Sequence, residues 1–205
     1  LVTRNDMNHA PEVYSYDLTK KTWKQITKVN DEAYAKISAC KTEKRWVTTT
    51  DGKKMLVWVI LPPNFDKTKK YPALLYCQGG PQSALTQSYS FRWNFQLMAS
   101  QGYIIVAPNR RGMPGHGTAW NEQISGDWGG QVMDDYIAAI DDIAKESYVD
   151  KTCLGAVGAS YGGYSVFHLA GIHKNRFKTF ISHSGIFNTE SMYGTTEEVF
   201  FTNWD

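Results

Sequence analysis

Residues 158–163 of the chain read Gly-Ala-Ser-Tyr-Gly-Gly, and this stretch decides the expected fold. A strand-like apolar run, 152–158, precedes it, and a segment of helical length, 161–172, follows it. Ser160 is therefore expected on a sharp turn, flanked by glycines where a side chain would collide with neighbouring backbone. Such a turn points the hydroxyl out of the sheet, and the helix aims its first amides at an incoming oxyanion. The pattern predicts a nucleophilic serine; the alternative is a glycine-rich turn with an inert serine.

A second glycine-rich turn, Gln-Gly-Gly-Pro at 78–81, directly follows the buried strand-like run 71–77. In the α/β-hydrolase fold, one oxyanion-hole N–H belongs to the residue after the nucleophile and another to a loop after an earlier strand. Here the donors would be the backbone N–H of Tyr161 and that of Gly80 or Gly79. Together the two turns predict an acyl-transfer site, whereas the second alone would be an ordinary turn.

Short apolar runs alternate with helical segments through most of the chain, which predicts an α/β fold with a parallel sheet covered on both faces. Asp51-Gly52 separates the first two runs and predicts a two-residue hairpin. The expected strands are 45–50, 55–60, 71–77, 103–108, 153–157 and 178–183, and the expected helices lie near 91–101, 131–146 and 161–172.

The first 40 residues follow a different pattern. Residues 12–18 alternate apolar and polar side chains, as in a half-buried antiparallel strand, and 23–27 return after a turn at 19–22. Residues 31–40 are expected to form a linker to the larger α/β domain.

Composition excludes several classes of partner. The 205 residues include 22 basic and 20 acidic side chains, and 42% are hydrophobic. No basic stripe indicates nucleic acid, and no apolar run reaches membrane-spanning length. The five histidines lack metal-ligand spacing, so we expect no metal and no cofactor. The three cysteines lack a C-x-x-C pattern, and Cys77 and Cys153, in expected central strands, are interpreted as small buried hydrophobes.

Two adjacent arginines, Arg110 and Arg111, follow the carboxyl end of an expected strand, where ligands bind in α/β folds. They would either clamp a substrate carboxylate or phosphate, or hold the loop through ion pairs with acids such as Asp127 or Asp134. The second interpretation is favoured.

The ordered series of motifs from Asp51 to the C-terminus resembles the prolyl oligopeptidase family of serine peptidases, and most of all its dipeptidyl peptidase V and acylaminoacyl peptidase branch. The branch usually carries His-Gly-Gly-Pro where this chain has Gln78. The series comprises Asp51-Gly52, Leu61-Pro62-Pro63, Tyr71-Pro72, Gln78-Gly-Gly-Pro81, Asn109-Arg-Arg-Gly112, Gly115-His-Gly117, Gly126-Asp-Trp-Gly129, Asp134-Asp135 and Gly158–Gly163.

The resemblance implies a domain division and a reaction. Residues 1–40 would be the end of a β-propeller domain, with a hairpin of its last blade and a linker, and residues 41–205 the α/β-hydrolase catalytic domain. The longer protein of which this chain would be a part, called the parent below, would be an exopeptidase-type serine peptidase. It would act on short peptides through a Ser160 acyl-enzyme. An esterase or lipase of the same fold is one alternative, and a non-catalytic binding scaffold is another, which the intact elbow disfavours.

The order of residues after the serine indicates whether this chain contains the whole catalytic triad. An α/β-hydrolase orders its triad as Ser, acid, His, but the first acid after Ser160 is Glu190 and the last histidine is His183. We therefore expect the acid and base beyond residue 205, and an isolated chain that is inactive. The alternative is a catalytically dead protein. The open edge of the 178–183 strand further predicts either a homo-oligomer or a longer protein of which this chain is one part.

Substrate contacts are expected near the two turns and after the last strand. Gln78 would line the site. Apolar side chains after the last strand would form the pocket for the residue that precedes the cleaved bond, with core packing as the alternative. These side chains are Ile186, Phe187, Met192 and Tyr193. The compartment would be periplasmic or extracellular if a signal peptide precedes the chain in the parent, and cytoplasmic otherwise.

Overall fold

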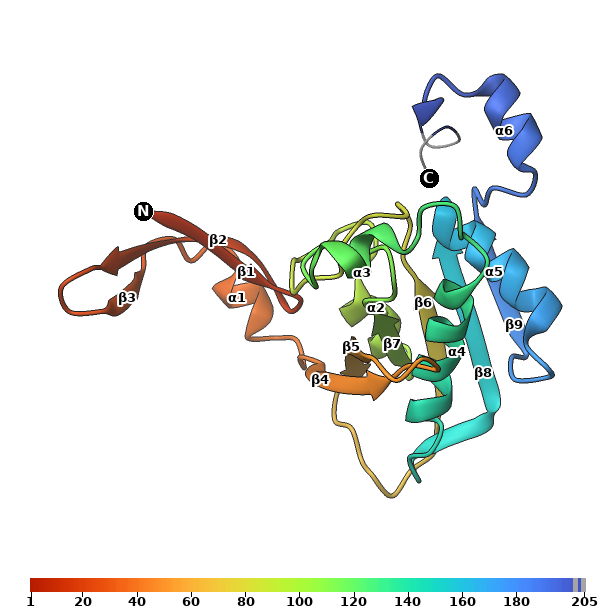
Figure 1. The fold of residues 1–205 in the computed structure, drawn as a ribbon. Helices are drawn as coiled ribbons and strands as arrows, with labels where there is room; N and C mark the ends of the chain where they lie inside the picture. The colour runs from red at the N-terminus through yellow and green to blue at the C-terminus, as the bar shows by residue number, and fades with distance from the viewer. Residues whose placement is uncertain (201–202, 204–205) are drawn as a thin grey trace.

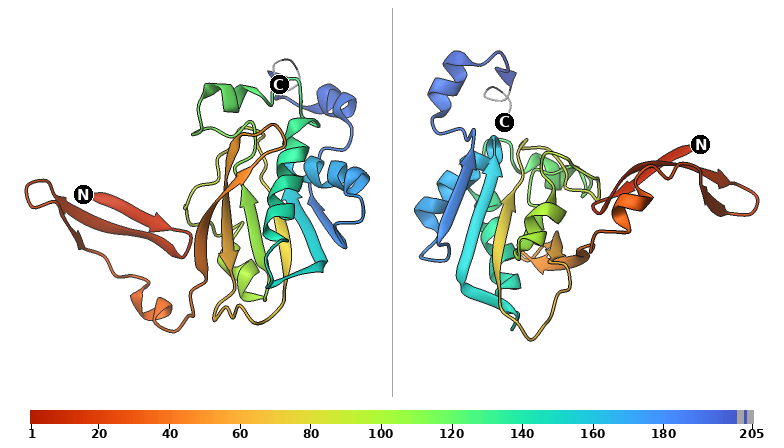
Figure 2. Two further views of the ribbon diagram at one scale, coloured as in Figure 1. Left: turned by 60° about the horizontal axis from the view of Figure 1, so that its bottom comes forward. Right: turned by 180° about the vertical axis from the view of Figure 1, so that it is seen from behind.

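The computed structural model describes residues 1–200 and residue 203 (Figure 1). Its first sheet has three antiparallel strands: β1 (Val2–Asp6), β2 (His9–Asp17) and β3 (Thr22–Gln25). This sheet extends away from the rest of the chain in every view (Figures 1 and 2). The expected hairpin corresponds to β2 and β3. Strand β1 was not expected, because its Val-Thr-Arg-Asn-Asp sequence is largely polar.

The second sheet has six strands in the order β4-β5-β7-β6-β8-β9. Strands β6 to β9 run parallel to one another, whereas β4 and β5 form an antiparallel hairpin and β5 pairs antiparallel with β7. The hairpin around Asp51 and the parallel strands are thus confirmed. The strands are β4 (Lys41–Thr48), β5 (Lys54–Leu61), β6 (Tyr71–Cys77), β7 (Ile104–Pro108), β8 (Val149–Ala159) and β9 (Thr179–His183).

Helices cover both faces of this sheet. Residues of α4 (Gln131–Ile143) and α5 (Tyr161–Ile172) pack in one apolar cluster, and α2 (Phe95–Ser100) packs in the other. Three further helices among the described residues are short: α1 (Asp31–Tyr34), α3 (Thr118–Glu122) and α6 (Thr189–Thr195). The helix expected near 91–101 begins only at Phe95, because the Asn94 side chain accepts a hydrogen bond from the Leu97 N–H (3.0 Å) and caps it.

Strand β5 shows how one strand serves both faces. Val57, Val59 and Leu61 pack in the α4–α5 cluster, and Trp58 and Ile60 pack in the α2 cluster. Successive side chains of a strand point to opposite faces, so a strand covered on both sides is continuously apolar. The expectation of a sheet covered on both faces is confirmed.

One burial expectation was wrong. Cys77 is fully buried in β6, but Cys153 is exposed. The pairing of β6 with β8 is irregular between the Tyr71–Val149 and Ala73–Leu154 partners, and Cys153 lies in the extra length of β8 between them. Among the described residues, no helix has the length and apolar character needed to cross a membrane.

Candidate active site

The serine turn has the backbone conformation that its sequence predicts. Ser160 lies between β8 and α5 with φ 58° and ψ −123°. A positive φ is rare and strained for a residue with a side chain, so surrounding contacts must hold it. The Ser160 N–H donates to the His183 carbonyl oxygen of β9 (3.1 Å), and the Ser160 carbonyl accepts from the Tyr164 N–H (2.9 Å). The turn is thereby tied both to the neighbouring strand and to its own helix.

The glycines around the serine are required by close backbone packing. A Cβ atom on Gly158 would lie 2.4 Å from the Gly162 carbonyl oxygen. A Cβ atom on Gly162 would lie 2.0 Å from the carbonyl oxygen of Cys77, and one on Gly163 would lie 2.5 Å from the Gly185 Cα. The structure thus leaves no room for side chains at these positions, as the motif predicts.

The loop at residues 78–81 lies against this turn. A Cβ atom on Gly79 would stand 2.9 Å from the Ala159 carbonyl oxygen and 3.6 Å from the Ser160 Cβ. Gly80 has φ 126°, a conformation that glycine adopts readily. The Gln78 side-chain amide donates to the Ser83 hydroxyl (3.2 Å), within its own loop. Strand β6 therefore delivers the loop to the same edge of the sheet as Ser160.

The side chain of Tyr161 faces the interior. Its ring is fully buried, its hydroxyl donates to the Trp128 carbonyl oxygen (2.7 Å), and burial raises its pKa above the usual range. Tyr161 therefore presents only its backbone to the outer side of the turn.

Arg110 connects the loop to the serine turn, a role that the sequence analysis missed. Its side chain is fully buried and donates to the carbonyl oxygens of Gln78 (3.2 Å) and Arg111 (2.7 Å) and to the Tyr136 hydroxyl (3.1 Å). Its guanidinium carbon also lies 4.8 Å from the centre of the Tyr161 ring. No spacing in the sequence reveals these contacts, because they join separate elements.

Arg111 forms the ion pairs that the sequence analysis favoured, but with different acids. The prediction that Asp127 or Asp134 would be the partner was wrong. The two nitrogens of its fork donate to Asp51 of the β4–β5 turn (2.9 and 2.5 Å), and its Nε lies 3.4 Å from Asp135 Oδ2 of α4. Hydrogen bonds from Arg111 hold the Asp51 pKa well below its usual range, whereas burial raises the Asp135 pKa to about 6. Arg111 therefore ties the hairpin turn to α4.

Two of the histidines lie near the serine turn or its helix. His183 lies at the end of β9 with its ring 6.2 Å from that of Trp93, and its backbone supports Ser160. His168 lies 6.0 Å from the Tyr164 ring. Within residues 1–200 and 203, no group of three or more His, Cys, Asp or Glu side chains could hold a metal ion.

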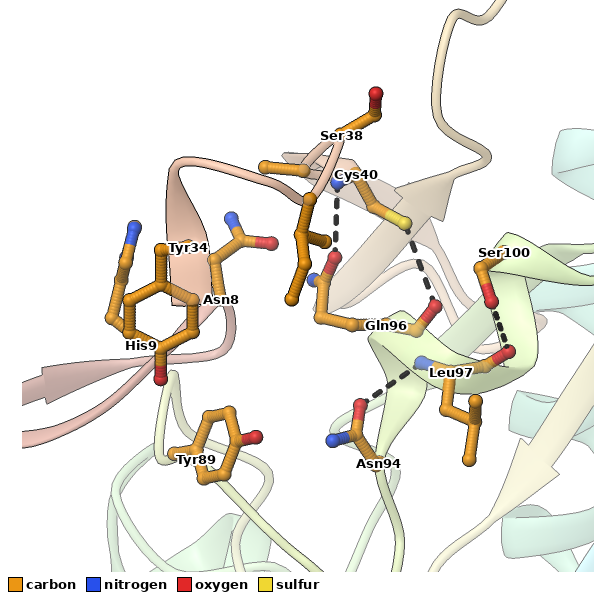
Figure 3. Close-up of a pocket in the computed structure, with 12 residues that line it drawn as sticks. Asn8, His9, Tyr34, Ser38, Cys40, Tyr89, Asn94, Gln96, Leu97 and Ser100 are labelled. Atoms are coloured by element: carbon orange, nitrogen blue, oxygen red, sulfur yellow. Dashed lines mark hydrogen bonds between the residues drawn. The ribbon is translucent and has the colours of Figure 1, made fainter. Parts of the chain in front are cut away.

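Two cavities lie on the α2 side of the sheet. One of about 180 Å³ adjoins the glycine-rich loop and is lined by Gln78 with aromatic side chains that include Tyr76 and Trp93. A larger one of about 240 Å³ lies between the N-terminal segments and α2, and includes Cys40 and Gln96 (Figure 3). None of its lining residues belongs to the serine turn or the loop. Burial raises the pKa of the Cys40 thiol to about 11, which disfavours the reactive thiolate form.

The apolar residues expected to form the substrate pocket lie in the segment after β9, which includes α6. Figure 1 shows where this segment lies. Phe187 is 84% exposed, and its ring lies 5.7 Å from that of Phe167 on α5. Tyr193, on α6, is 54% exposed, and Ile186 and Met192 are half-buried. Their arrangement around a substrate stays a prediction.

Comparisons with known proteins agree with this geometry. The model of the prolyl oligopeptidase family matches residues 89–205. Over all 205 residues, the chain is 55% identical to part of a protein named dipeptidyl-peptidase 5 from Porphyromonas endodontalis. It is also 55% identical, over the same length, to a protein of the same name from Porphyromonas gingivalis. The chain spans 30% of the length of each of these relatives.

Solved structures show the same fold. A Pyrococcus horikoshii acylaminoacyl peptidase superposes on 98% of the chain with a TM-score of 0.88 and 24% identity, and 32% of that protein is covered. Dipeptidyl peptidase 4 of Porphyromonas gingivalis superposes on 86% of the chain, with a TM-score of 0.71, 25% identity and 26% of that protein covered. With its serine turn, its glycine-rich loop and these matches, the chain belongs to the prolyl oligopeptidase family.

Proposed function

We propose that the whole protein is a serine peptidase of the exopeptidase type, which releases dipeptides or acylated amino acids from short peptides and uses Ser160 as its nucleophile. The observation that carries the proposal is the strained Ser160 turn packed against the Gly79 loop at one edge of the sheet. The names of the relatives support the dipeptidyl and acylaminoacyl classes.

In the proposed reaction, the Ser160 hydroxyl oxygen bonds to the scissile carbonyl carbon while its proton passes to a histidine base. The carbonyl π bond opens, and its electron pair moves to the carbonyl oxygen. Backbone N–H groups of Tyr161 and of Gly80 or Gly79 stabilise that oxyanion. The tetrahedral intermediate collapses, the C–N bond breaks, and the leaving amine takes the proton. Water then hydrolyses the acyl-enzyme by the same steps.

The proposal assigns the rest of the machinery as follows. The triad acid and histidine lie beyond residue 205. Ile186, Phe187, Met192 and Tyr193 form apolar surface for the residue that precedes the cleaved bond, and Gln78 lines the site beside the loop. Residues 41–205 belong to an α/β-hydrolase catalytic domain. Residues 1–40 are the end of a β-propeller domain and its linker, an assignment supported by the antiparallel β1–β2–β3 sheet.

A fluorophosphonate probe tests the proposal on the whole protein. The parent should be labelled covalently and should cleave dipeptidyl or acylaminoacyl amide substrates, because the probe captures activated serines. Ser160→Ala should abolish both labelling and turnover. Ser100→Ala is the matched control, because Ser100 lies exposed at the end of α2 and should leave both unchanged. Undiminished labelling of Ser160→Ala would overturn the assignment.

A further inference from the structure

Arg110 carries a buried positive charge that pairs with no carboxylate among the described residues. Its side chain is fully buried, yet none of the ion pairs formed among residues 1–200 and 203 includes it. The adjacent Arg111 is equally buried but has both Asp51 and Asp135. Burying a cation without a counterion costs free energy, so a pure loop-holding role is better served by the arrangement at Arg111.

The contacts of Arg110 are all with neutral groups, and they fix its orientation. The guanidinium donates to two backbone carbonyls and to the Tyr136 hydroxyl. It also lies 4.8 Å from the centre of the Tyr161 ring and 5.9 Å from that of Tyr136. Three hydrogen bonds from one planar fork leave it little freedom to rotate.

One of those carbonyls belongs to a peptide group of the proposed oxyanion hole. Arg110 Nη2 donates to the Gln78 carbonyl oxygen (3.2 Å), and the N–H of that peptide group is the N–H of Gly79. The Gln78–Gly79 bond is trans, so its N–H points away from the carbonyl and hence from Arg110. A cation bound to the carbonyl draws electron density across the amide and makes the N–H a stronger donor.

The same guanidinium contacts the other half of the site. Its central carbon lies over the ring of Tyr161, whose backbone N–H is the second proposed donor. The Tyr161 ring is also held by its hydrogen bond to the Trp128 carbonyl (2.7 Å). Arg110 therefore touches the residues that supply both donors, but it lies behind them and does not face the substrate.

We propose that Arg110 is a positioning residue of the reaction: it aligns the Gly79 and Tyr161 amides and polarises the Gly79 N–H toward the oxyanion. The inference rests on the proposed peptidase function. Because the substrate carbonyl is neutral and the tetrahedral intermediate is anionic, the effect is stronger in the transition state than in the ground state. It should therefore appear in kcat rather than in KM.

The test compares Arg110→Lys and Arg110→Met with Tyr136→Phe in the whole protein. Lysine keeps the charge but lacks the planar fork, and methionine removes the charge. Tyr136→Phe removes one acceptor of the same guanidinium but leaves its bonds to the Gln78 and Arg111 carbonyl oxygens, which still hold the fork in place. All three should lower the Tm, so the control separates lost stability from lost catalysis.

We expect kcat to fall about 10-fold in Arg110→Lys and about 100-fold in Arg110→Met, with KM nearly unchanged. The reference is the loss of a whole oxyanion donor, which lowers kcat by a factor of about 10²–10³. Affinity for a peptide aldehyde, which forms a tetrahedral adduct on the serine, should fall in parallel. In a fourth variant, Arg110→Ala, added guanidinium ion should restore part of the lost kcat. Tyr136→Phe should keep a kcat within about twofold of the parent.

Parent-like kcat in any folded Arg110 variant overturns the inference. An effect that appears only in KM also overturns it. So does a loss of kcat in Tyr136→Phe as large as that in the Arg110 variants. If no Arg110 variant folds, the residue is structural and the inference is likewise overturned. Ser160→Ala, assayed in parallel, separates the two proposals: turnover that survives in it contradicts the peptidase assignment itself, whatever Arg110 does.

Discussion

The backbone of Gly162 lies directly against the carbonyl oxygen of Cys77, so a Cβ atom on Gly162 would stand 2.0 Å from that oxygen. The contact joins the first turn of α5 to the end of β6. It therefore sets the distance between the serine turn and the glycine-rich loop that follows Cys77. Of the glycine contacts around the serine, this is the one that joins its helix directly to the strand before the loop.

Gly162→Ala should consequently destabilise the protein and abolish its reactivity. Overpacking a close backbone contact costs about 1–3 kcal/mol, and any relaxation moves the loop away from Ser160. Gly171→Ala is the matched control, because it lies on the same helix and nothing lies within 4 Å of its added Cβ. The control should be neutral or stabilise by up to about 1 kcal/mol. Thermal unfolding and fluorophosphonate labelling measure both effects, and a Gly162→Ala protein with parent-like labelling would contradict the prediction.

Asp135 should make the protein less stable as the pH rises. Burial raises its pKa in the folded state to about 6, above the ordinary value of 3.8. Between these values the folded state holds a proton that the unfolded state has lost. The contribution of Asp135 is therefore most favourable below pH 4 and declines until about pH 6, by up to about 3 kcal/mol for two pKa units. Unfolding at several pH values should show that Asp135→Asn removes this decline.

Asp51 should have the opposite pH dependence and serves as the control. Hydrogen bonds from Arg111 lower its pKa, so its ionised form contributes stability above its usual pKa, and this contribution is lost as the pH falls below it. The difference in unfolding free energy between the parent and Asp51→Asn should therefore shrink on acidification. If the unfolding free energies of Asp135→Asn and Asp51→Asn differ from that of the parent in the same way at every pH, burial and ion pairing do not act differently on the two carboxylates. That result would contradict both predictions.

Truncation of Phe187 should change substrate selectivity. If the segment after β9 contacts the residue before the cleaved bond, Phe187→Ala should alter the ranking of kcat/KM among substrates that differ at that residue. Rank changes of about 10-fold are expected from lost apolar contact. Leu18→Ala, equally exposed at 83% but in the β2–β3 turn, should leave the ranking unchanged. A change in stability with the ranking intact would contradict the prediction.

Residues 1–205 produced alone should lack peptidase activity, because a serine hydroxyl without an ordered base is a weak nucleophile at neutral pH. Strand β9 pairs only with β8 among the described residues, and its free edge favours association between copies. Assays with dipeptidyl and acylaminoacyl substrates measure the first property, and sedimentation measures the second. Turnover that depends on Ser160 would show that a base lies within these residues, with His183 beside the serine turn as the candidate.

The sequence by itself determined the elements whose signals are local. The β6 and α5 boundaries agree with the expected ones, and the Ser160 turn has the strained backbone that its motif predicts. An apolar run followed by glycine, and glycines at fixed offsets from a serine, act through neighbours along the chain. Such signals can be recognised without knowledge of the fold.

Only the tertiary structure decided which distant groups meet. In the folded chain, β7 lies between β5 and β6, Cys153 is exposed, and Arg111 pairs with Asp51, which lies 60 residues away. It also placed Arg110 behind the glycine-rich loop rather than against an acid. Two adjacent arginines are alike in sequence, but their partners depend on how the sheet brings a hairpin turn, a helix and a loop to one place. Burial and charge pairing arise from that assembly, so neither can be read from local pattern.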